Sequence, residues 1–110
     1  MQLIDSHTHI YGEEFDEDRD EMLARATAAG IGQMVLPNVD AASYPRVLDL
    51  CVAHPDRLFP TIGLHPTYVK EDYTSQLNYM ERELSQRPHV AIGEIGLDYY
   101  WDTTYQREQI

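Results

Sequence analysis

The chain has 110 residues, a common length for one domain and too short for two. Hydrophobic residues make up 43% and charged residues 25%, as in globular proteins, and no apolar run approaches the ~20 residues that cross a membrane. The net charge of −11 argues against a broad basic face that grips nucleic acid by charge alone, although bound divalent cations can supply local positive charge. The single cysteine, Cys51, excludes an internal disulfide, so we expect a cytoplasmic protein.

Apolar runs and amphipathic segments alternate along the chain. The apolar runs predict four strands, at residues 3–4, 31–39, 58–66 and 89–98. Apolar residues at helical spacing predict three helices between these strands, and the helices end at or before Gly30, Pro55 and Pro88. Ser43 is predicted to cap the second of these helices.

The strands recur at roughly 26–32 residues, the size of a βα unit, which predicts an α/β fold with a parallel sheet. Thr103 and Gln106 form a capping-box pattern and predict a fourth helix, which continues for only about two turns. A short, frayed terminal helix is one interpretation. We favour the other, in which residues 1–110 are a single partial domain that stops within its fourth helix.

Polar residues follow each predicted strand rather than being scattered along the chain. In chain order they are Asp5, His7, His9, Asn38, Asp40, His65, Glu94 and Asp98. The carboxyl ends of parallel strands form the edge where α/β sheets and barrels bind ligands. Four strands that agree on one edge predict a functional site there.

His7 and His9 are spaced so that both side chains can face one cation. Residues i and i+2 of a strand point to the same face, about 6.6 Å apart along it. Two polar residues at the end of an ordinary strand are the competing interpretation. With Glu94 on the same predicted edge we favour a metal site, in which Asp5 could orient a ligand histidine.

His65 and Glu94 each have a functional and a structural interpretation. His65 precedes a proline and could contact a substrate or a metal-bound ligand, or it could cap a loop carbonyl. Glu94 lies in an apolar run, where a carboxylate is costly unless it binds a metal or pairs with an arginine. Gly93 and Gly96 indicate a close approach of the backbone near this site.

The segments DSHTHI, PNVD, IGLHP and GEIGLDYYWD, in this order, closely resemble the TatD family of metal-dependent hydrolases. The resemblance covers essentially the whole chain and implies the first half of a (β/α)8 barrel and deoxyribonuclease activity on phosphodiester bonds. It implies that His7 and His9 bind a metal and that Glu94 binds, or bridges, one or two divalent ions such as Mg, Mn or Zn. His65 matches a catalytic histidine at the rim of the site, and Asp98 matches a supporting residue.

The family also has two histidines and an aspartate on later strands, and these have no counterpart among residues 1–110. We therefore expect the chain alone to be inactive or weak. Two alternatives to a DNA-cleaving phosphodiesterase stay open, a hydrolase of small amides or esters and a non-catalytic half barrel. We expect DNA or another phosphodiester as substrate, no membrane partner, and self-association through the exposed half-barrel edge.

Overall fold

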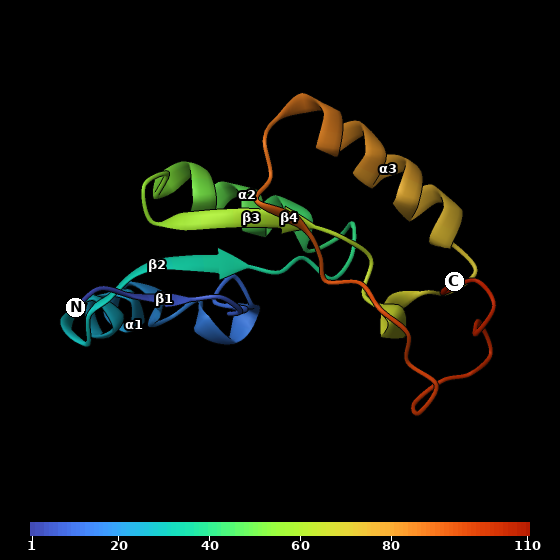
Figure 1. Cartoon of the computed structure of the whole chain (residues 1–110), viewed down its shortest axis with the longest axis horizontal. Helices are drawn as coiled ribbons and strands as arrows, with labels where there is room; N and C mark the ends of the chain where they lie inside the picture. The colour runs from blue at the N-terminus through green and yellow to red at the C-terminus, as the bar shows by residue number, and fades with distance from the viewer.

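The computed structural model describes residues 1–110 and contains a four-stranded parallel sheet (Figure 1). The strand order follows the chain, β1-β2-β3-β4, and every neighbouring pair is parallel. The strands are β1 (Leu3–Asp5), β2 (Ile31–Leu36), β3 (Leu58–Ile62) and β4 (Ala91–Ile92). The predicted parallel α/β organisation is confirmed.

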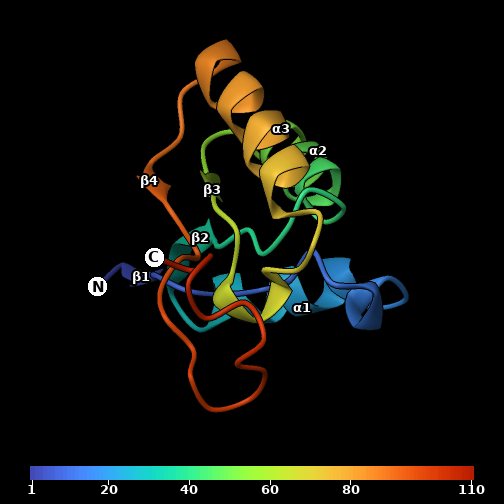
Figure 2. The same cartoon turned by 90° about the vertical axis from the view of Figure 1, so that its right-hand side faces the viewer.

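Helices connect the strands and lie along one side of the curled sheet, as Figure 2 shows. The connecting helices are α1 (Arg19–Ala28), α2 (Tyr44–Ala53) and α3 (Tyr73–Gln86), with short 3-10 turns η1 (Glu13–Phe15) and η2 (Pro66–Tyr68). Gly30 follows α1 with a φ of 89°, a conformation that glycine adopts without strain. Arg87 is extended after α3 because it precedes Pro88. Strands that alternate with helices on one side of a curled sheet form the first half of a (β/α)8 barrel.

The helices are held to the sheet by two clusters of buried side chains. The larger cluster joins α1 and α2 to β2 and β3, and it includes Leu23, Met34, Leu36, Val47 and Leu58. The smaller cluster lies under α3 and contains Tyr44, Ile62, Leu64, Val69 and Met80. Burial of these apolar side chains supplies the main driving force for folding and fixes where the strand ends lie.

The fourth strand is much shorter than predicted. We expected residues 89–98 to be extended in the sheet, but only Ala91 and Ile92 pair, and both are exposed. β4 has β3 on one side and no strand on the other, so half of its main-chain groups lack a strand partner. The apolar pattern of this run therefore does not correspond to burial.

Two predicted helix features also differ. Residues 104–109 form successive turns rather than a helix, with one α-helical main-chain hydrogen bond, from Gln109 to Tyr105 at 3.2 Å. A helix this short has a costly nucleus and gains little without packing. Ser43 makes no capping hydrogen bond with its side chain; its own main-chain N–H donates to the carboxylate of Asp40 at 2.8 Å. None of the helices combines the length and apolarity needed to cross a membrane.

Candidate metal centre

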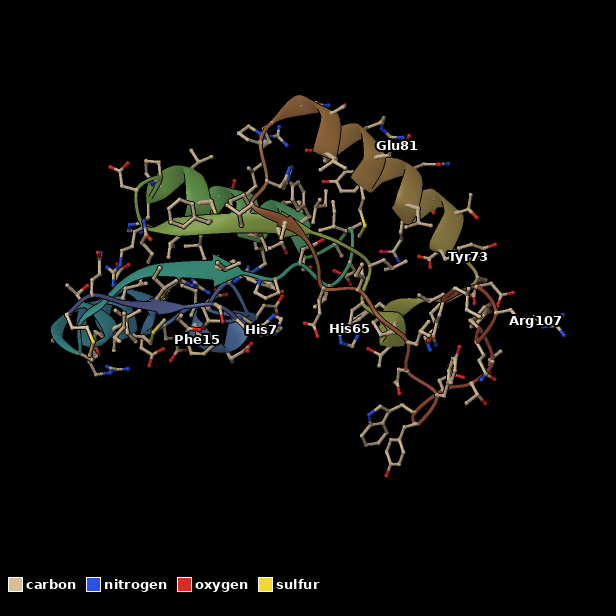
Figure 3. All side chains as sticks on the ribbon, viewed as in Figure 1. His7, Phe15, His65, Tyr73, Glu81 and Arg107 are labelled. Carbon is tan, nitrogen blue, oxygen red and sulfur yellow. The ribbon has the colours of Figure 1, made fainter.

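The structure brings four of the predicted site residues to one edge of the sheet. His7 and His9 follow β1, His65 follows β3, and Glu94 follows β4. Figure 3 shows His7 and His65 near each other beyond the carboxyl ends of the strands. Residues far apart in sequence therefore meet at the edge where parallel α/β folds place ligands.

The histidine rings converge on the Glu94 carboxylate. The Nε2 atoms of His7 and His9 are 3.1 Å apart and lie 3.3 and 3.5 Å from Oε2 of Glu94. The other carboxylate oxygen, Oε1, lies 3.2 Å from Nε2 of His65. The side chains around the Glu94 carboxylate are thus histidines, and the arginine pair that was its alternative interpretation does not occur.

The spacing of these atoms fits a metal ion. Nitrogen and oxygen ligands about 2.1 Å from a tetrahedral ion stand about 3.4 Å from one another. The three donor atoms of His7, His9 and Glu94 are separated by 3.1, 3.3 and 3.5 Å. Two imidazoles and one carboxylate are also a donor set that zinc and manganese accept.

A tight contact between strand ends helps to place Glu94. A Cβ atom on Gly63 would lie 2.7 Å from the carbonyl carbon of Gly93, so only glycine allows β3 and the residues after β4 to approach this closely. Buried Asn38 links the same strand ends, because its main-chain oxygen accepts from Glu94 N at 2.7 Å and its side-chain oxygen accepts from Gly63 N at 3.2 Å. The close backbone approach expected at Gly93 is present, against Gly63, and Asn38 links the same strands.

His65 differs from the other histidines in its hydrogen bonding. The main-chain N–H of Thr67 donates to Nδ1 of His65 at 3.2 Å, and the Thr67 hydroxyl lies 2.7 Å from the same atom. Because a main-chain N–H can only donate, Nδ1 carries no proton, and the proton of neutral His65 lies on Nε2. His65 therefore presents a donor to Glu94 and to whatever binds beside it.

His9 lies in a different environment. Burial lowers the pKa of His9, and the nearby His7 lowers it further, which favours the neutral ring, the form that binds metals. Its Nδ1 lies 2.9 Å from the hydroxyl of Tyr11, which donates to the main-chain oxygen of Pro37 at 2.6 Å. Neither Tyr11 nor Thr67 was predicted from sequence, although each lies two residues from a predicted site histidine.

Three other predicted candidates, all aspartates, accept hydrogen bonds from main-chain N–H groups. Asp5 accepts from the main-chain N–H of His7 at 3.0 Å, so it fixes the backbone and does not orient the imidazole. Asp40 binds the start of α2 through Ser43. Asp98 accepts from the main-chain N–H of Tyr100 at 2.9 Å and shapes the turn after β4.

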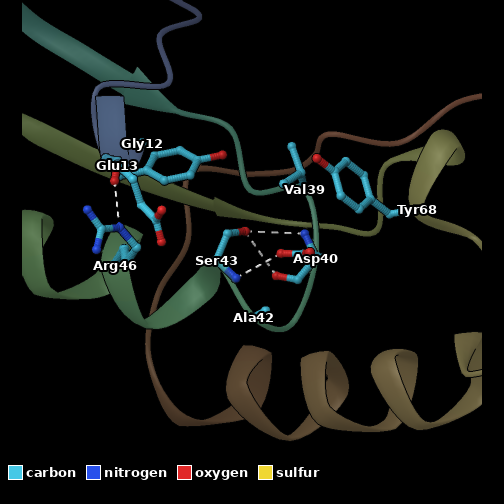
Figure 4. Close-up of a pocket in the computed structure, with 9 residues that line it drawn as sticks. Gly12, Glu13, Val39, Asp40, Ala42, Ser43, Arg46 and Tyr68 are labelled. Atoms are coloured by element: carbon cyan, nitrogen blue, oxygen red, sulfur yellow. Dashed lines mark hydrogen bonds between the residues drawn. The ribbon is translucent and has the colours of Figure 1, made fainter. Parts of the chain in front are cut away.

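The histidine cluster and Glu94 line a cavity of about 420 Å³, and a second cavity of about 290 Å³ shares Tyr11 and Tyr68 with it (Figure 4). The wall of the second cavity includes Tyr11, Asp40, Ser43, Arg46 and Tyr68. The Arg46 guanidinium already has two partners there. Its Nε donates to the main-chain oxygen of Tyr11 at 2.8 Å, and its Nη2 pairs with the carboxylate of Asp16. This arginine anchors the loop that carries His7 and His9.

Comparison with known proteins agrees with this geometry. The family model described as TatD related DNase matches residues 4–110. The metal-dependent hydrolase YjjV of Escherichia coli K12 is 34% identical over 111 residues, which cover 98% of this chain and 42% of YjjV. The 3'-5' ssDNA/RNA exonuclease TatD of Erwinia tasmaniensis is 33% identical, with 88% of this chain and 38% of the relative covered.

The fold comparison gives the same result. The crystal structure of YjjV superposes with a TM-score of 0.87 and 34% identity, covering 97% of this chain and 42% of that one. The chain thus spans about two fifths of the length of the relatives it matches. The matching family model, the identities and the shared half-barrel fold show that the chain belongs to the TatD family.

Proposed function

We propose that His7, His9 and Glu94 hold a divalent metal ion in the active centre of a hydrolase that cleaves phosphodiester bonds. The observation that carries the proposal is the convergence of two imidazole nitrogens on one oxygen of Glu94, at 3.3 and 3.5 Å, at the carboxyl edge of the sheet. The relatives' names, a metal-dependent hydrolase and a 3'-5' ssDNA/RNA exonuclease, favour this activity and a nucleic-acid substrate.

The proposed chemistry divides between the ion and the protein. A divalent ion held there would supply Lewis acidity for a phosphate oxygen and for the attacking water. Glu94 contributes negative charge, and its second oxygen accepts a hydrogen bond from Nε2 of His65. The Nε2 hydrogen of His65 faces Glu94 here, and it would orient a phosphate oxygen by donating to that oxygen in place of Glu94. Zn or Mn suits the two imidazoles better than Mg, which prefers oxygen ligands.

We also propose that the 110-residue chain binds the ion but hydrolyses substrate weakly on its own. Only two histidines and one carboxylate supply the three converging donor atoms of the cluster. The acidic net charge of −11 favours a second candidate, hydrolysis of small neutral esters or amides, over cleavage of a polyanion. A non-catalytic half barrel is a third candidate, and it predicts no stoichiometric metal.

These candidates are separated by one set of assays. The chain is loaded with Mn²⁺ or Zn²⁺, and turnover of a single-stranded DNA oligomer is compared with turnover of a p-nitrophenyl ester. We expect slow, metal-dependent cleavage of the oligomer that His7→Ala abolishes. Faster turnover of the ester would favour the second candidate. Turnover of the oligomer as fast as that of a full-length nuclease would contradict the proposal that this chain alone is inactive or weak.

Exposed apolar side chains suggest self-association through the β4 edge. Ile92 is 54% exposed, and further apolar residues of the same segment are exposed as well, including Ile95, Leu97, Tyr100 and Trp101. Unpaired main-chain groups beside such side chains favour pairing with a second chain. Sedimentation equilibrium is expected to show dimers or larger species that dissociate in Ile92→Lys, whereas a stable wild-type monomer would contradict self-association.

A further inference from the structure

The hydroxyl of Tyr11 connects His9 to the end of β2. Tyr11 is 4% exposed, and its O–H donates to the main-chain oxygen of Pro37 at 2.6 Å. The same oxygen lies 2.9 Å from Nδ1 of His9. A phenol has one hydrogen, and at Tyr11 it is used on Pro37, so the contact to His9 requires that Nδ1 of His9 carries a proton.

We infer that Tyr11 is a positioning residue that holds His9 in the Nδ1–H tautomer and so presents the Nε2 lone pair to the metal. The opposite arrangement, in which Tyr11 donates to His9, would leave two oxygen atoms 2.6 Å apart with no hydrogen between them. The inference rests on the proposed metal centre for its consequence, but the tautomer is a property of the metal-free chain.

His65 shows that this tautomer is specific to one ring. Thr67 donates to Nδ1 of His65 from its main-chain N–H, which places the proton of that ring on Nε2. His9 and His65 both direct Nε2 at the Glu94 carboxylate, at 3.5 and 3.2 Å. Their different neighbours place a lone pair at Nε2 of His9 and a hydrogen at Nε2 of His65. Of these two rings, therefore, His9 is the one prepared as a ligand.

The fold holds Tyr11 in place from both directions. Its ring is buried next to Ile10 in the larger core cluster, and its main-chain oxygen accepts from Nε of Arg46 at 2.8 Å. Pro37, its acceptor, directly follows β2. The orientation of His9 is therefore set by the register of β1 against β2 and is present before any metal binds.

The tautomers can be read directly from the wild-type chain. Long-range ¹H–¹⁵N correlation spectra of the metal-free protein assign the protonated ring nitrogen of each histidine. We expect Nδ1–H for His9 and Nε2–H for His65. An Nε2–H tautomer at His9 would overturn the inference without any variant being made.

A variant tests the consequence for binding. Tyr11→Phe keeps the ring and removes the hydroxyl, and Tyr79→Phe on α3 is the matched control. We expect Tyr11→Phe to move the His9 proton toward Nε2 and to weaken Zn²⁺ binding about 10–100-fold, as loss of such partners commonly does, while Tyr79→Phe matches wild type. A folded Tyr11→Phe that keeps the Nδ1–H tautomer and wild-type affinity would overturn the inference. Absence of Zn²⁺ binding by wild type would instead contradict the proposed function.

Discussion

The two segments that form the candidate metal centre differ in how firmly the fold holds them. The loop after β1, which carries His7 and His9, is anchored by buried Ile10 and Tyr11. Arg19 adds hydrogen bonds to the main-chain oxygens of Ile10, at 2.6 Å, and Gly12, at 2.8 Å. The core thus holds the loop that carries His7 and His9 in position.

The segment after β4 brings Glu94 with far less support. Ile95 is 60% exposed and Leu97 is 59% exposed, against 2% for Ile10. Glu94 itself is fixed mainly through its main-chain hydrogen bond to Asn38, at 2.7 Å. The first segment is thus packed into the core, whereas the second leaves its apolar side chains exposed and is held mainly by main-chain hydrogen bonds.

A pair of isoleucine substitutions should show the largest difference between the two segments. Ile10→Ala should lower the free energy of unfolding by about 2–5 kcal/mol because it opens a cavity in the core. Ile95→Ala should change it by less than about 0.5 kcal/mol, since the side chain is exposed. Urea unfolding followed by circular dichroism measures both, and equal effects would contradict the contrast between the segments.

Removing the charge of Glu94 tests the weaker segment's contribution to the site. Glu94→Gln keeps the size of the side chain but loses the carboxylate, so Mn²⁺ affinity should fall about 100-fold or more, beyond the range for loss of an indirect partner. Isothermal titration calorimetry gives the constant, with exposed Glu81→Gln on α3 as the control. Unchanged affinity in Glu94→Gln would remove Glu94 from the site.

Alkaline pH should weaken the core that anchors the first segment. Burial raises the pKa of the Cys51 thiol to about 12, above its ordinary value of 9.0. The unfolded chain therefore loses this proton first, and the stability contribution is complete below pH 9 and is lost as pH rises toward 12. We expect a loss of about 2 kcal/mol between pH 8 and pH 10.5. Cys51→Ala should show a smaller loss, and an equal one would contradict the assignment.

Metal should tighten the second segment more than the first. The amide of Glu94 should exchange its hydrogen about tenfold more slowly when Mn²⁺ is bound, because the ion stabilises only the docked segment. Main-chain amides of α1 should show no comparable change beyond global stabilisation. Hydrogen exchange followed by mass spectrometry compares the two, and uniform protection would contradict an ion-dependent segment.

The sequence predicted the features that depend on local pattern. Helical spacing and alternation predicted the parallel sheet and the three helices, and the position of His7, His9, His65 and Glu94 after strands predicted that they meet at one edge. The short β4 was missed because an apolar run predicts a buried strand, and residues 89–98 are mostly exposed here. A sequence pattern shows which residues are apolar but not whether other elements pack over them.

Hydrogen-bond partners across the fold were beyond sequence patterns. Tyr11 stands two residues after His9, but its role depends on Pro37, which is 26 residues away in the chain. The Thr67 contact is local, since a residue two positions after a histidine can donate to its ring, but the sequence analysis did not predict it. Asp5 was expected to orient an imidazole and instead holds the main chain. Residue type and spacing limit what a side chain can do, and the tertiary neighbours decide which option is used.

Anomalous scattering from crystals grown with Mn²⁺ is the most direct test of the proposed metal centre at His7, His9 and Glu94. We expect one strong peak about 2.0–2.3 Å from Nε2 of His7, Nε2 of His9 and a carboxylate oxygen of Glu94. A map without a peak at these three residues, or with its strongest peak elsewhere on the chain, would contradict the proposed metal centre.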